Sequence, residues 1–519
     1  MTPHYLQTIE NIRQIEEAYV ATTAIKNPKL SLMQQAGEAV AKHALSMLKK
    51  SKTKNVLLLI GPGNNGGDAW VAANQLRQAK ANVTVLSLGE QTLHDAAAKK
   101  AFNEFQAADV SATANIATIV KAWPKQLKID LIIDGLFGIG LTRAPSGAFA
   151  DAINEANRQR QNNLTLVLAI DIPTGLNANT GAAFQPSIEA DETITFIAGK
   201  PGLHTADGRD NTGKVSVITL GVSSSESNIS LLTQAEAASL IPPRRENSHK
   251  GNYGNVGIIG GAQGMAGAAV IAARAALNIG PGKVFLGLFD KDRPAYDVLN
   301  PEIMLRDARD LAKDDSMTAF AIGMGAGDAG MASIMSLLTL NKPIVVDADA
   351  LNAIASNPSI KAAFQAKKTE SALPALPFIF TPHPGEAARL LDVKTADIQA
   401  DRLNSALKIA QLFDVVTILK GAGSIIAHPD GRIAINPTGN AGMASGGMGD
   451  ALSGMLAALL AVGCTTWDAA RLGVYLHGAA GNAACHHGMG PHGLTASDVI
   501  FEARGLLNSG LDAGHDEGT

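Results

Sequence analysis

The stretch VLLLIGPGNNGGDAWVAANQL, Val56–Leu76, determines the fold of the first part of the chain. An apolar, strand-like run leads into a glycine-rich turn and then into an alanine-rich, helix-like run. Gly61, Gly63 and Gly66 satisfy the G-x-G-x-x-G pattern of a dinucleotide-binding loop, and Glu90 after the next strand is a candidate ribose-binding acid. A lone pattern of this kind is weak evidence, so an ordinary dinucleotide site and a different site built from similar parts both stay open.

The polar residues beside these glycines are unusual for a diphosphate site. Asn64, Asn65 and Asp68 put two amides and a carboxylate on the predicted loop, and Asp68 would repel a pyrophosphate placed there. The alternative is that these side chains only cap the helix that follows.

Apolar strand-like runs alternate with alanine-rich helical runs along the whole chain. In the first half the strand-like runs are NVLLLIG, ANVTVLSLG, IDLIIDGLF, LTLVLAIDIP and ADETITFIA. The alternation restarts with NVGIIGGA, KVFLGLFD, AFAIGMGAG, KPIVVDADAL and PFIFTPHPGE, followed by VVTILKGAGSIIAH and GRIAINP as a hairpin around HPDGR. Continuous apolar strands separated by helices predict parallel sheets covered on both faces. The expected fold class is α/β.

A chain of 519 residues is too long for one ordinary core. The stretch 221–251 holds a serine cluster, a proline pair and charges, which predicts a connection rather than a core element. We expect a doubly wound, Rossmann-like domain at 1–222, a connecting segment at 223–245, a second α/β domain at 246–510 and a tail at 511–519.

Composition excludes several classes of protein. The net charge of −4 gives no electrostatic grip on nucleic acid or anionic lipid. The longest apolar run, LSGMLAALLAVGC, is shorter than the roughly 18 residues typical of a membrane span. Two cysteines fit a reducing compartment, and no signal peptide is visible at the start. We expect a cytoplasmic protein with no nucleic-acid or membrane partner.

Polar residues follow two more strands of the first half. Asp134 ends one strand and precedes the glycine-rich turn Gly138–Gly140, while Asp171 and Thr174 follow another. Ligands of open α/β sheets bind beyond the carboxyl ends of the strands, so these loops predict one pocket. Asn65, Asp134 and Thr174 also offer hard oxygen ligands to a cation.

In the second half the strongest signal is AGMASGGMGDALSGMLAALL. Its glycines at 446, 447 and 449 precede a helix that starts near Asp450. Amides at a helix N-terminus bind a phosphoryl group, and an aspartate there can take a proton from an attacking hydroxyl. The alternative is an aspartate that only caps the helix. Lys420 in ILKGAGSII suits a nucleotide, and His383 and Glu386 in TPHPGEAARLL lie on a loop entering a helix.

Together these motifs resemble the bifunctional NAD(P)H-hydrate repair enzyme family, which joins an NAD(P)HX epimerase to an ADP/ATP-dependent NAD(P)HX dehydratase. GPGNNGGD, DGLFGIGL and DIPTG are similar to the epimerase signatures. HKGNYGNVGIIGGAQGMAGAA, PEIM, DADAL, TPHPGE, LKG and GNAGMASGGMGD are similar to those of the dehydratase. The resemblance covers nearly the whole chain, and it implies a ribokinase-like fold for the second domain. IGMGAGD departs from the family by having Met324 where proline is usual.

The resemblance also implies site residues. For the epimerase substrate they are Asn64, Asn65, Gly66, Gly67, Asp68, Gly138, Ile139, Gly140, Leu141, Thr142, Arg143, Ala144 and Asp171. For potassium they are Asn65, Asp134 and Thr174. For the dehydratase substrate they are Ala268, Gly325, His383 and Asp450, and for the adenine nucleotide Lys420, Gly421, Ala422, Gly423, Ser424 and Gly449.

The implied substrates are NADHX and NADPHX. Asp450 would be the base that deprotonates the C6 hydroxyl of the S epimer. This hydroxyl would receive a phosphoryl group from ADP, with Mg²⁺ present, and would then leave as phosphate. ATP is the alternative phosphoryl donor. Asp171 is the candidate for proton transfer between the R and S epimers. We also expect a homo-oligomer.

Two other functions stay open. The glycine–aspartate motif alone also fits a small-molecule kinase, for example of a vitamin-precursor alcohol, with an accessory nucleotide-binding domain. The first domain would alternatively be a non-catalytic binding or interaction module.

Overall fold

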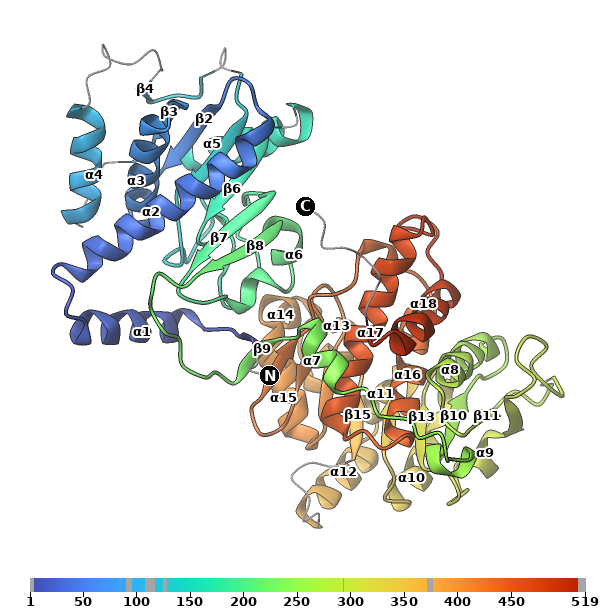
Figure 1. Ribbon diagram of the computed structural model, residues 1–519. Helices are drawn as coiled ribbons and strands as arrows, with labels where there is room; N and C mark the ends of the chain where they lie inside the picture. Colours follow the sequence, from blue (N-terminus) through green and yellow to red (C-terminus); the bar gives the residue numbers. More distant parts are fainter. Residues whose placement is uncertain are drawn as a thin grey trace. The chain divides into compact units, whose positions relative to one another are not determined.

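The computed structural model describes residues 4–89, 96–107, 117–124, 128–163, 165–292, 294–370 and 377–511. The chain forms two compact units, Tyr5–Ser227 and Asn228–Thr519, the latter together with Met1–His4 (Figure 1). We call them the N-terminal and the C-terminal unit. The predicted α/β class is confirmed. Glu90 and the predicted tail beyond Leu511 lie outside the described residues.

The described strands of the N-terminal unit form a seven-stranded sheet in the order β4-β3-β2-β5-β6-β7-β8. All neighbouring pairs are parallel. The strands are β2 (Asn55–Ile60), β3 (Asn82–Ser87), β4 (Ala117–Val120), β5 (Leu131–Gly135), β6 (Leu166–Ile170), β7 (Glu192–Phe196) and β8 (Lys214–Ile218). The helices are α1 (Ile9–Thr22), α2 (Pro28–Met47), α3 (Asn64–Gln78), α4 (Ala96–Ala107), α5 (Ala148–Asn163) and α6 (Gly208–Asn211).

Different helices cover the two faces of this sheet (Figure 1). Successive residues of a strand point to opposite faces. Val56, Leu58 and Ile60 of β2 pack in a buried cluster with residues of α2, α3 and α4. Leu57 and Leu59 pack in another with residues of α5. Both faces are buried, which is why this strand is apolar at consecutive positions.

The strand order reverses between β2 and β5, since the chain moves outward to β3 and β4 and returns to the other side of β2. Such a switch point leaves a crevice at the carboxyl ends of the two strands. The turn after β2 is confined to 61–63, and α3 begins at Asn64. The prediction that Asn65 and Asp68 lie on the loop is therefore wrong, because they lie in the first turns of α3.

The described strands of the C-terminal unit form an eleven-stranded sheet in the order β1-β9-β18-β17-β16-β15-β14-β13-β10-β11-β12. Strands β10 to β16 pair in parallel, and the order reverses between β10 and β13. The strands are β1 (His4–Tyr5), β9 (Ile229–Leu231), β10 (Asn255–Gly260), β11 (Lys283–Leu288), β12 (Met304–Asp307), β13 (Ala319–Ile322), β14 (Ile344–Val346), β15 (Phe378–Phe380), β16 (Val416–Leu419), β17 (Ile425–Ala427) and β18 (Ile433–Ile435).

Helices again cover both faces of the C-terminal sheet. Ile379 of β15 belongs to a buried cluster that includes residues of α8, α16, α17 and α18. On the other face, Phe378 and Phe380 pack in edge-on or tilted contacts with Phe364 and Phe413. The helices are α7 (Gln234–Ser239), α8 (Ala266–Ile279), α9 (Ala308–Leu311), α10 (Gly330–Thr339), α11 (Ala348–Ser356), α12 (Pro358–Glu370), α13 (Pro384–Leu391), α14 (Thr395–Ala400), α15 (Arg402–Phe413), α16 (Met448–Ala461), α17 (Thr466–His486) and α18 (Ala496–Asn508).

Two local expectations need correction. The stretch 223–245 contains β9 and α7, and Leu232 and Ala237 are buried in the core of the C-terminal unit. The serine-rich composition predicted a connecting segment and gave no indication of these two short elements. VVTILKGAGSIIAH is not one strand but two antiparallel strands, β16 and β17, because the glycines at 421 and 423 turn the chain between them. The hairpin of β17 and β18 around HPDGR is observed as predicted.

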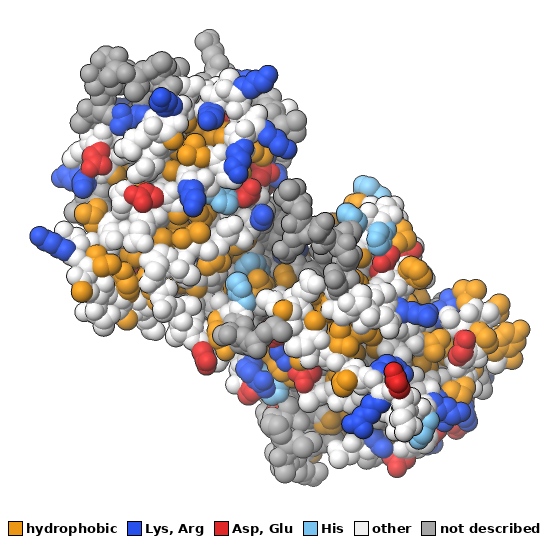
Figure 2. Space-filling view, viewed as in Figure 1, with side chains coloured by type: hydrophobic (Ala, Val, Ile, Leu, Met, Phe, Trp, Pro, Cys, Tyr) orange, Lys and Arg blue, Asp and Glu red, His pale blue; other side chains and the backbone are white. Residues whose placement is uncertain are grey.

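On the face drawn in Figure 2, side chains of both charges are interspersed on each unit. Among the described residues, no helix combines the length and apolarity needed to cross a bilayer.

The contact between α8 and α16 gives a stability prediction. A Cβ at Gly454 of α16 would lie 2.0 Å from the carbonyl oxygen of Ala272 in α8, so Gly454→Ala forces two helix backbones apart. We expect it to lower the free energy of unfolding by about 1–3 kcal/mol. Gly505→Ala in α18 is the matched control, since nothing lies within 4 Å of its Cβ position. There alanine should stabilise the helix, by up to about 1 kcal/mol. Equal effects in urea unfolding would contradict the prediction.

Candidate active sites

A cavity of about 820 Å³ opens at the switch point of the N-terminal sheet. It is lined by the loops after β2, β5, β6, β7 and β8 and by parts of α1, α2 and α3. Ten of the thirteen residues predicted to bind the epimerase substrate line it: Asn64, Asn65, Asp68, Gly138, Ile139, Gly140, Leu141, Thr142, Arg143 and Asp171.

The other three, Gly66, Gly67 and Ala144, are not among the lining residues. The two glycines are buried for packing reasons. A Cβ at Gly66 would meet the carbonyl oxygen of Gly61 at 2.0 Å, and one at Gly67 would meet the side chain of Met33 at 2.6 Å. They let α3 pack closely from its first turn.

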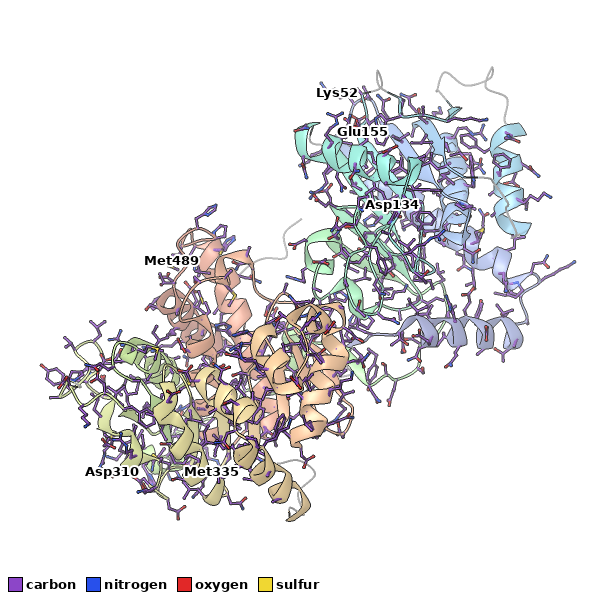
Figure 3. All side chains as sticks on the ribbon, turned by 180° about the vertical axis from the view of Figure 1, so that it is seen from behind. Lys52, Asp134, Glu155, Asp310, Met335 and Met489 are labelled. Carbon is purple, nitrogen blue, oxygen red and sulfur yellow. The ribbon has the colours of Figure 1, made fainter. Side chains whose placement is uncertain are left out.

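Asp134 is a fully buried carboxylate at the end of β5, inside the N-terminal unit (Figure 3). Its two oxygens accept hydrogen bonds from the backbone N–H and the hydroxyl of Thr174, both at 2.7 Å. Burial raises the pKa of Asp134 to about 6, and the bonds from Thr174 oppose this shift. The ionised form is thus costly unless a positive charge is near.

The carbonyl oxygen of Phe137 lies between the other two predicted cation ligands. It accepts a hydrogen bond from Asn65 Nδ2 at 3.1 Å and lies 3.2 Å from Thr174 Oγ1. One carboxylate, one hydroxyl, one amide and one carbonyl therefore cluster at the carboxyl ends of β5 and β6. This donor set is chemically suited to a hard cation such as potassium, which proteins commonly bind through carbonyl and carboxylate oxygens.

The predicted site of the C-terminal unit also lies at a carboxyl edge, on loops after neighbouring parallel strands. Gly325 follows β13, and a Cβ there would lie 3.3 Å from Ala268 Cβ at the start of α8, so these two residues are close together. His383 follows β15 and Lys420 follows β16. Asp347, at the end of β14, connects this group to α16.

Asp347 is buried and hydrogen-bonded through both oxygens. Oδ1 accepts from Lys420 Nζ at 2.7 Å and from the N–H of Ala348 at 2.9 Å, while Oδ2 accepts from Ser453 Oγ at 2.7 Å. Burial lowers the pKa of Lys420, but the carboxylates of Asp347 and Glu386 outweigh it and hold the pKa above its usual value. Lys420 is therefore a permanent cation at this site.

Asp450 lies in the first turn of α16, behind the exposed Gly446 and the left-handed Gly447, whose φ is 88°. Burial and the nearby Asp347 carboxylate raise the pKa of Asp450 to about 6, with Lys420 opposing. A Cβ at Gly449 would lie 3.3 Å from Lys420 Nζ. The amino end of α16 thus lies near a lysine and near a carboxylate whose pKa is about 6. Such a site can bind an anion and can accept a proton from it.

His383 caps α13 rather than standing free. Its Nδ1 accepts hydrogen bonds from the N–H groups of Gly385 and Glu386, and Nε2 is 3.2 Å from Glu386 Oε1. Burial and the charge of Lys420 lower the pKa of His383. Burial also raises the pKa of Glu386.

The predicted nucleotide residues 420–424 form the turn between β16 and β17. The buried Arg402 supports this turn by donating to the carbonyl oxygens of Leu419 and Lys420, both at 3.3 Å. Ser424 Oγ donates to the carbonyl oxygen of Gly421 at 3.1 Å.

Comparison with known proteins identifies the family to which the chain belongs. Residues 256–501 match the family model described as NAD(P)H-hydrate dehydratase, and residues 29–202 match that of the YjeF-related protein N-terminus. The bifunctional NAD(P)H-hydrate repair enzyme of Escherichia coli is 35% identical over 99% of this chain and 96% of its own. That of Moorella thermoacetica is 35% identical over 96% of this chain and 95% of its own.

The chain belongs to the bifunctional NAD(P)H-hydrate repair enzyme family. Among solved structures, an ADP/ATP-dependent NAD(P)H-hydrate dehydratase from Bacillus subtilis, co-crystallised with ATP/Mg²⁺, is 29% identical, with a TM-score of 0.45 over 54% of this chain and 98% of its own.

Three residues of this family member were not predicted as site residues. Lys200 bonds to Asp171, Asp347 bonds to Lys420, and Ser453 bonds to Asp347. The motif DADAL contains Asp347, but only the fold shows its lysine partner. Lys200 carried no sequence signal, since it follows a strand as one polar residue among glycine and proline.

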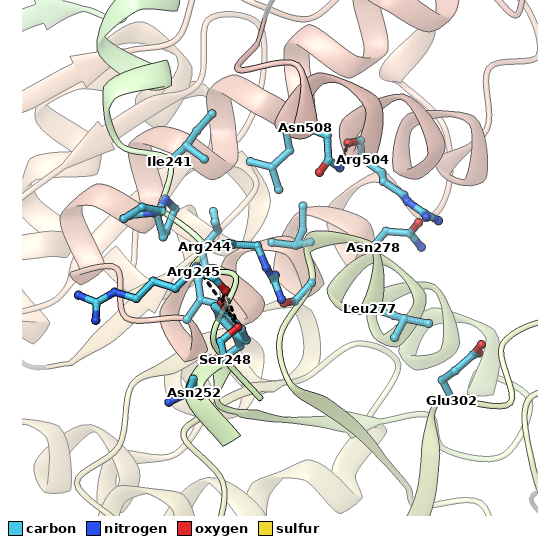
Figure 4. Close-up of a pocket in the computed structure, with 18 of the residues that line it drawn as sticks. Ile241, Arg244, Arg245, Ser248, Asn252, Leu277, Asn278, Glu302, Arg504 and Asn508 are labelled. Atoms are coloured by element: carbon cyan, nitrogen blue, oxygen red, sulfur yellow. Dashed lines mark hydrogen bonds between the residues drawn. The ribbon is translucent and has the colours of Figure 1, made fainter. Parts of the chain in front are cut away.

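A second cavity, of about 950 Å³, lies in the C-terminal unit of this repair-family chain (Figure 4). Its lining includes Leu277 near the end of α8, Leu459 near the end of α16 and Asn508 at the end of α18. Arg244 donates to the carbonyl oxygen of Gly280 at 2.7 Å and lies over the ring of Tyr253. The cavity therefore gathers helix carboxyl ends, where arginine offsets partial negative charge.

Proposed function

We propose that this chain repairs hydrated NADH and NADPH. Its N-terminal unit interconverts the R and S epimers of NAD(P)HX, and its C-terminal unit dehydrates the S epimer at the expense of ADP. The observation that carries the proposal is the place of Asp450, whose raised pKa suits a base, at the amino end of α16, where the Cβ position of the preceding Gly449 lies 3.3 Å from Lys420 Nζ. Family membership over nearly the full length supports it.

The dehydration follows from this arrangement. Asp450 takes the proton of the C6 hydroxyl while the hydroxyl oxygen attacks the terminal phosphorus of ADP. AMP leaves. Lys420 and the amides of α16 stabilise the charge on the transferring phosphoryl group. The lone pair of the ring nitrogen then expels phosphate from C6, and loss of a proton from C5 restores the dihydropyridine. Ala268, Gly325 and His383 would hold the substrate.

The epimerisation needs only a base. Asp171 takes the proton of the C6 hydroxyl, the O–H electron pair forms a C6 carbonyl, and the bond from C6 to N1 breaks with its electrons on N1. Closure of the ring on the other face of the carbonyl, with return of the proton, inverts C6. The first turns of α3, at 64–68, and the loop at 138–144 would hold the nucleotide.

Two ions belong to this proposal. Asn65, Asp134 and Thr174 would hold potassium, which would supply positive charge beside Asp134. Among the described residues, no group of three His, Cys, Asp or Glu side chains is arranged to hold a metal. Mg²⁺ would therefore be held mainly by the phosphates of the nucleotide bound near Lys420, Gly421, Ala422, Gly423, Ser424 and Gly449, as is usual for this ion.

We assign the epimerase to 1–222 and the dehydratase to 246–510, with β9 and α7 of the segment between them packing in the core of the C-terminal unit. A cytoplasmic location fits the two free cysteines. A homo-oligomer remains a prediction.

The test supplies the full-length protein with a mixture of R- and S-NADHX, Mg²⁺ and either ADP or ATP. Dihydronicotinamide absorbance and released phosphate are followed together. We expect the whole mixture to return to NADH, faster with ADP. Recovery of the S fraction alone would remove the epimerase assignment. A stable phosphoester in place of free phosphate would indicate a small-molecule kinase.

The raised pKa of Asp450 gives a pH prediction. Dehydration should fall as pH drops through about 6, because protonated Asp450 cannot accept the hydroxyl proton. In Asp347→Asn this midpoint should move to lower pH, since the carboxylate that raises the pKa of Asp450 is gone. Asp349→Asn should also move the midpoint of the pH profile to lower pH, but by less, because Asp349 raises the pKa of Asp450 less than Asp347 does. A midpoint unchanged by Asp347→Asn, measured from kcat across pH, would contradict the role of Asp450 as base.

The buried Asp134 gives a prediction on potassium and stability. Because its pKa in the fold is raised to about 6, this carboxylate costs stability as pH rises through that value. A bound cation offsets this cost, by about 2.7 kcal/mol at about 100 times its Kd. Replacing tetramethylammonium by K⁺ should thus raise the unfolding temperature of the N-terminal unit more above pH 6 than below it. Asp134→Asn should abolish the difference, and the exposed Asp151→Asn should keep it. A K⁺ effect that survives Asp134→Asn would exclude this site.

A further inference from the structure

Lys200 is a buried lysine in the wall of the N-terminal cavity, with its side chain 1% exposed. Its ammonium group donates to Asp171 Oδ1 at 2.5 Å, to Thr195 Oγ1 at 2.7 Å and to the carbonyl oxygen of Phe196 at 2.9 Å. An ammonium has three protons, so all donors of Lys200 are used inside the protein. Lys200 therefore has no donor left for a substrate.

The two oxygens of Asp171 have different surroundings. Oδ1 accepts from Lys200 Nζ, from Thr195 Oγ1 at 3.0 Å and from the N–H of Phe196 at 3.2 Å. Oδ2 has no hydrogen-bond partner within the described part of the chain. Asp171 lines the cavity, and its side chain is 15% exposed. The carboxylate is anchored through one oxygen and leaves the other for a ligand.

The backbone is strained at two positions near the Asp171–Lys200 pair, at Asp171 itself and at Ile197. Asp171 has a φ of 62°, and Ile197, which directly follows β7, has a φ of 68°. Each is the centre of a tight turn, with bonds of 2.8 Å from Ile172 N to the oxygen of Ile170 and from Ala198 N to that of Phe196. A left-handed conformation is costly for a β-branched residue, and such strain concentrates at functional sites. These neighbouring turns aim Asp171 and Lys200 at each other.

We propose that Lys200 is the positioning residue of the epimerase site, fixing Asp171 so that Oδ2 alone faces the C6 hydroxyl. This rests on the proposed function of Asp171 as the base. The ammonium keeps a compensating charge beside the carboxylate in a poorly hydrated wall, and its short bond stops the carboxylate from rotating. A positioned base loses rate steeply when displaced by about 1 Å.

Stability alone does not account for the pair. An ion pair removed from water gains little over apolar side chains of similar volume, because desolvating both charges offsets their attraction. A role through Asp171 predicts a change in turnover rather than in substrate binding. A purely structural role predicts loss of the fold or parallel changes in both.

The experiment measures conversion of R- to S-NADHX by full-length Lys200→Met, with Lys214→Met as the matched control. Lys214 is exposed on β8 and does not line the cavity. We expect kcat to fall about 100-fold in Lys200→Met with KM nearly unchanged. Dehydration of S-NADHX, measured on the same samples, should be unchanged in both variants. Methylammonium should restore part of the kcat of Lys200→Ala, because Lys200 borders the cavity.

Unchanged kcat in a folded Lys200→Met, or a loss confined to KM, would overturn the proposal. If Lys200→Met does not fold, Thr195→Val decides, since it removes one anchor of Oδ1 but keeps the ammonium. A lower kcat with unchanged KM then supports positioning, and unchanged kcat overturns it. A wild-type protein that does not epimerise R-NADHX would instead refute the proposed function.

Discussion

Both sheets of this protein are buried on both faces, and this constraint determines where its chemistry lies. A parallel strand covered by helices on each side, such as β2 with its apolar run Val56–Ile60, leaves no room for polar side chains along its length. The charged side chains of the predicted sites lie where the strands end. In each unit the strand order reverses once beside the first strand of the parallel series, β2 or β10, and in the N-terminal unit a cavity opens at the carboxyl edge there. The predicted functional residues gather at these edges.

Each edge contains an Asp–Lys pair with one buried partner, Lys200 in the N-terminal unit and Asp347 in the C-terminal unit, and the two pairs differ in which groups they leave available. In the N-terminal unit the ammonium group of Lys200 donates all three of its hydrogen bonds inside the protein. It binds Asp171 through Oδ1 only, which leaves Oδ2 available. In the C-terminal unit both oxygens of Asp347 are hydrogen-bonded, and the ammonium group of Lys420 has one hydrogen-bond partner among the described residues. In the proposed mechanism the first pair presents a base, while the second presents a cation for the phosphoryl group near Asp450. This difference suits proton transfer in one unit and phosphoryl transfer in the other.

Sequence reasoning found the strand ends because that step is local. Asp134 lies at the end of apolar strand β5, Asp171 and Thr174 follow apolar strand β6, and the carboxyl ends of parallel strands share one edge. It did not find Lys200, because only the pairing of β6 with β7 brings this residue to Asp171, 29 positions away. Asp347 was missed for the same reason, since its partner Lys420 lies 73 positions further on.

Other differences come from glycine and from short elements. Gly66 and Gly67 match a ligand-binding motif, yet their Cβ positions are blocked by Gly61 and Met33, so packing already requires glycine there. Strand β9 has three residues within a serine-rich stretch, and its place beside β18 depends on pairing with residues 204 positions further along the sequence. Composition gives no signal for such a contact.

The central claim is that one chain holds two separate activities, each with its own aspartate. Its most direct test uses Asp171→Asn and Asp450→Asn, singly and as an equimolar mixture, on R- and S-NADHX with ADP. Asp171→Asn should return only the S fraction to NADH beyond the spontaneous rate, and Asp450→Asn should return none while still interconverting the epimers. The mixture should recover all of the substrate. Full recovery by either variant alone, or failure of the mixture although both variants are folded, would contradict the account.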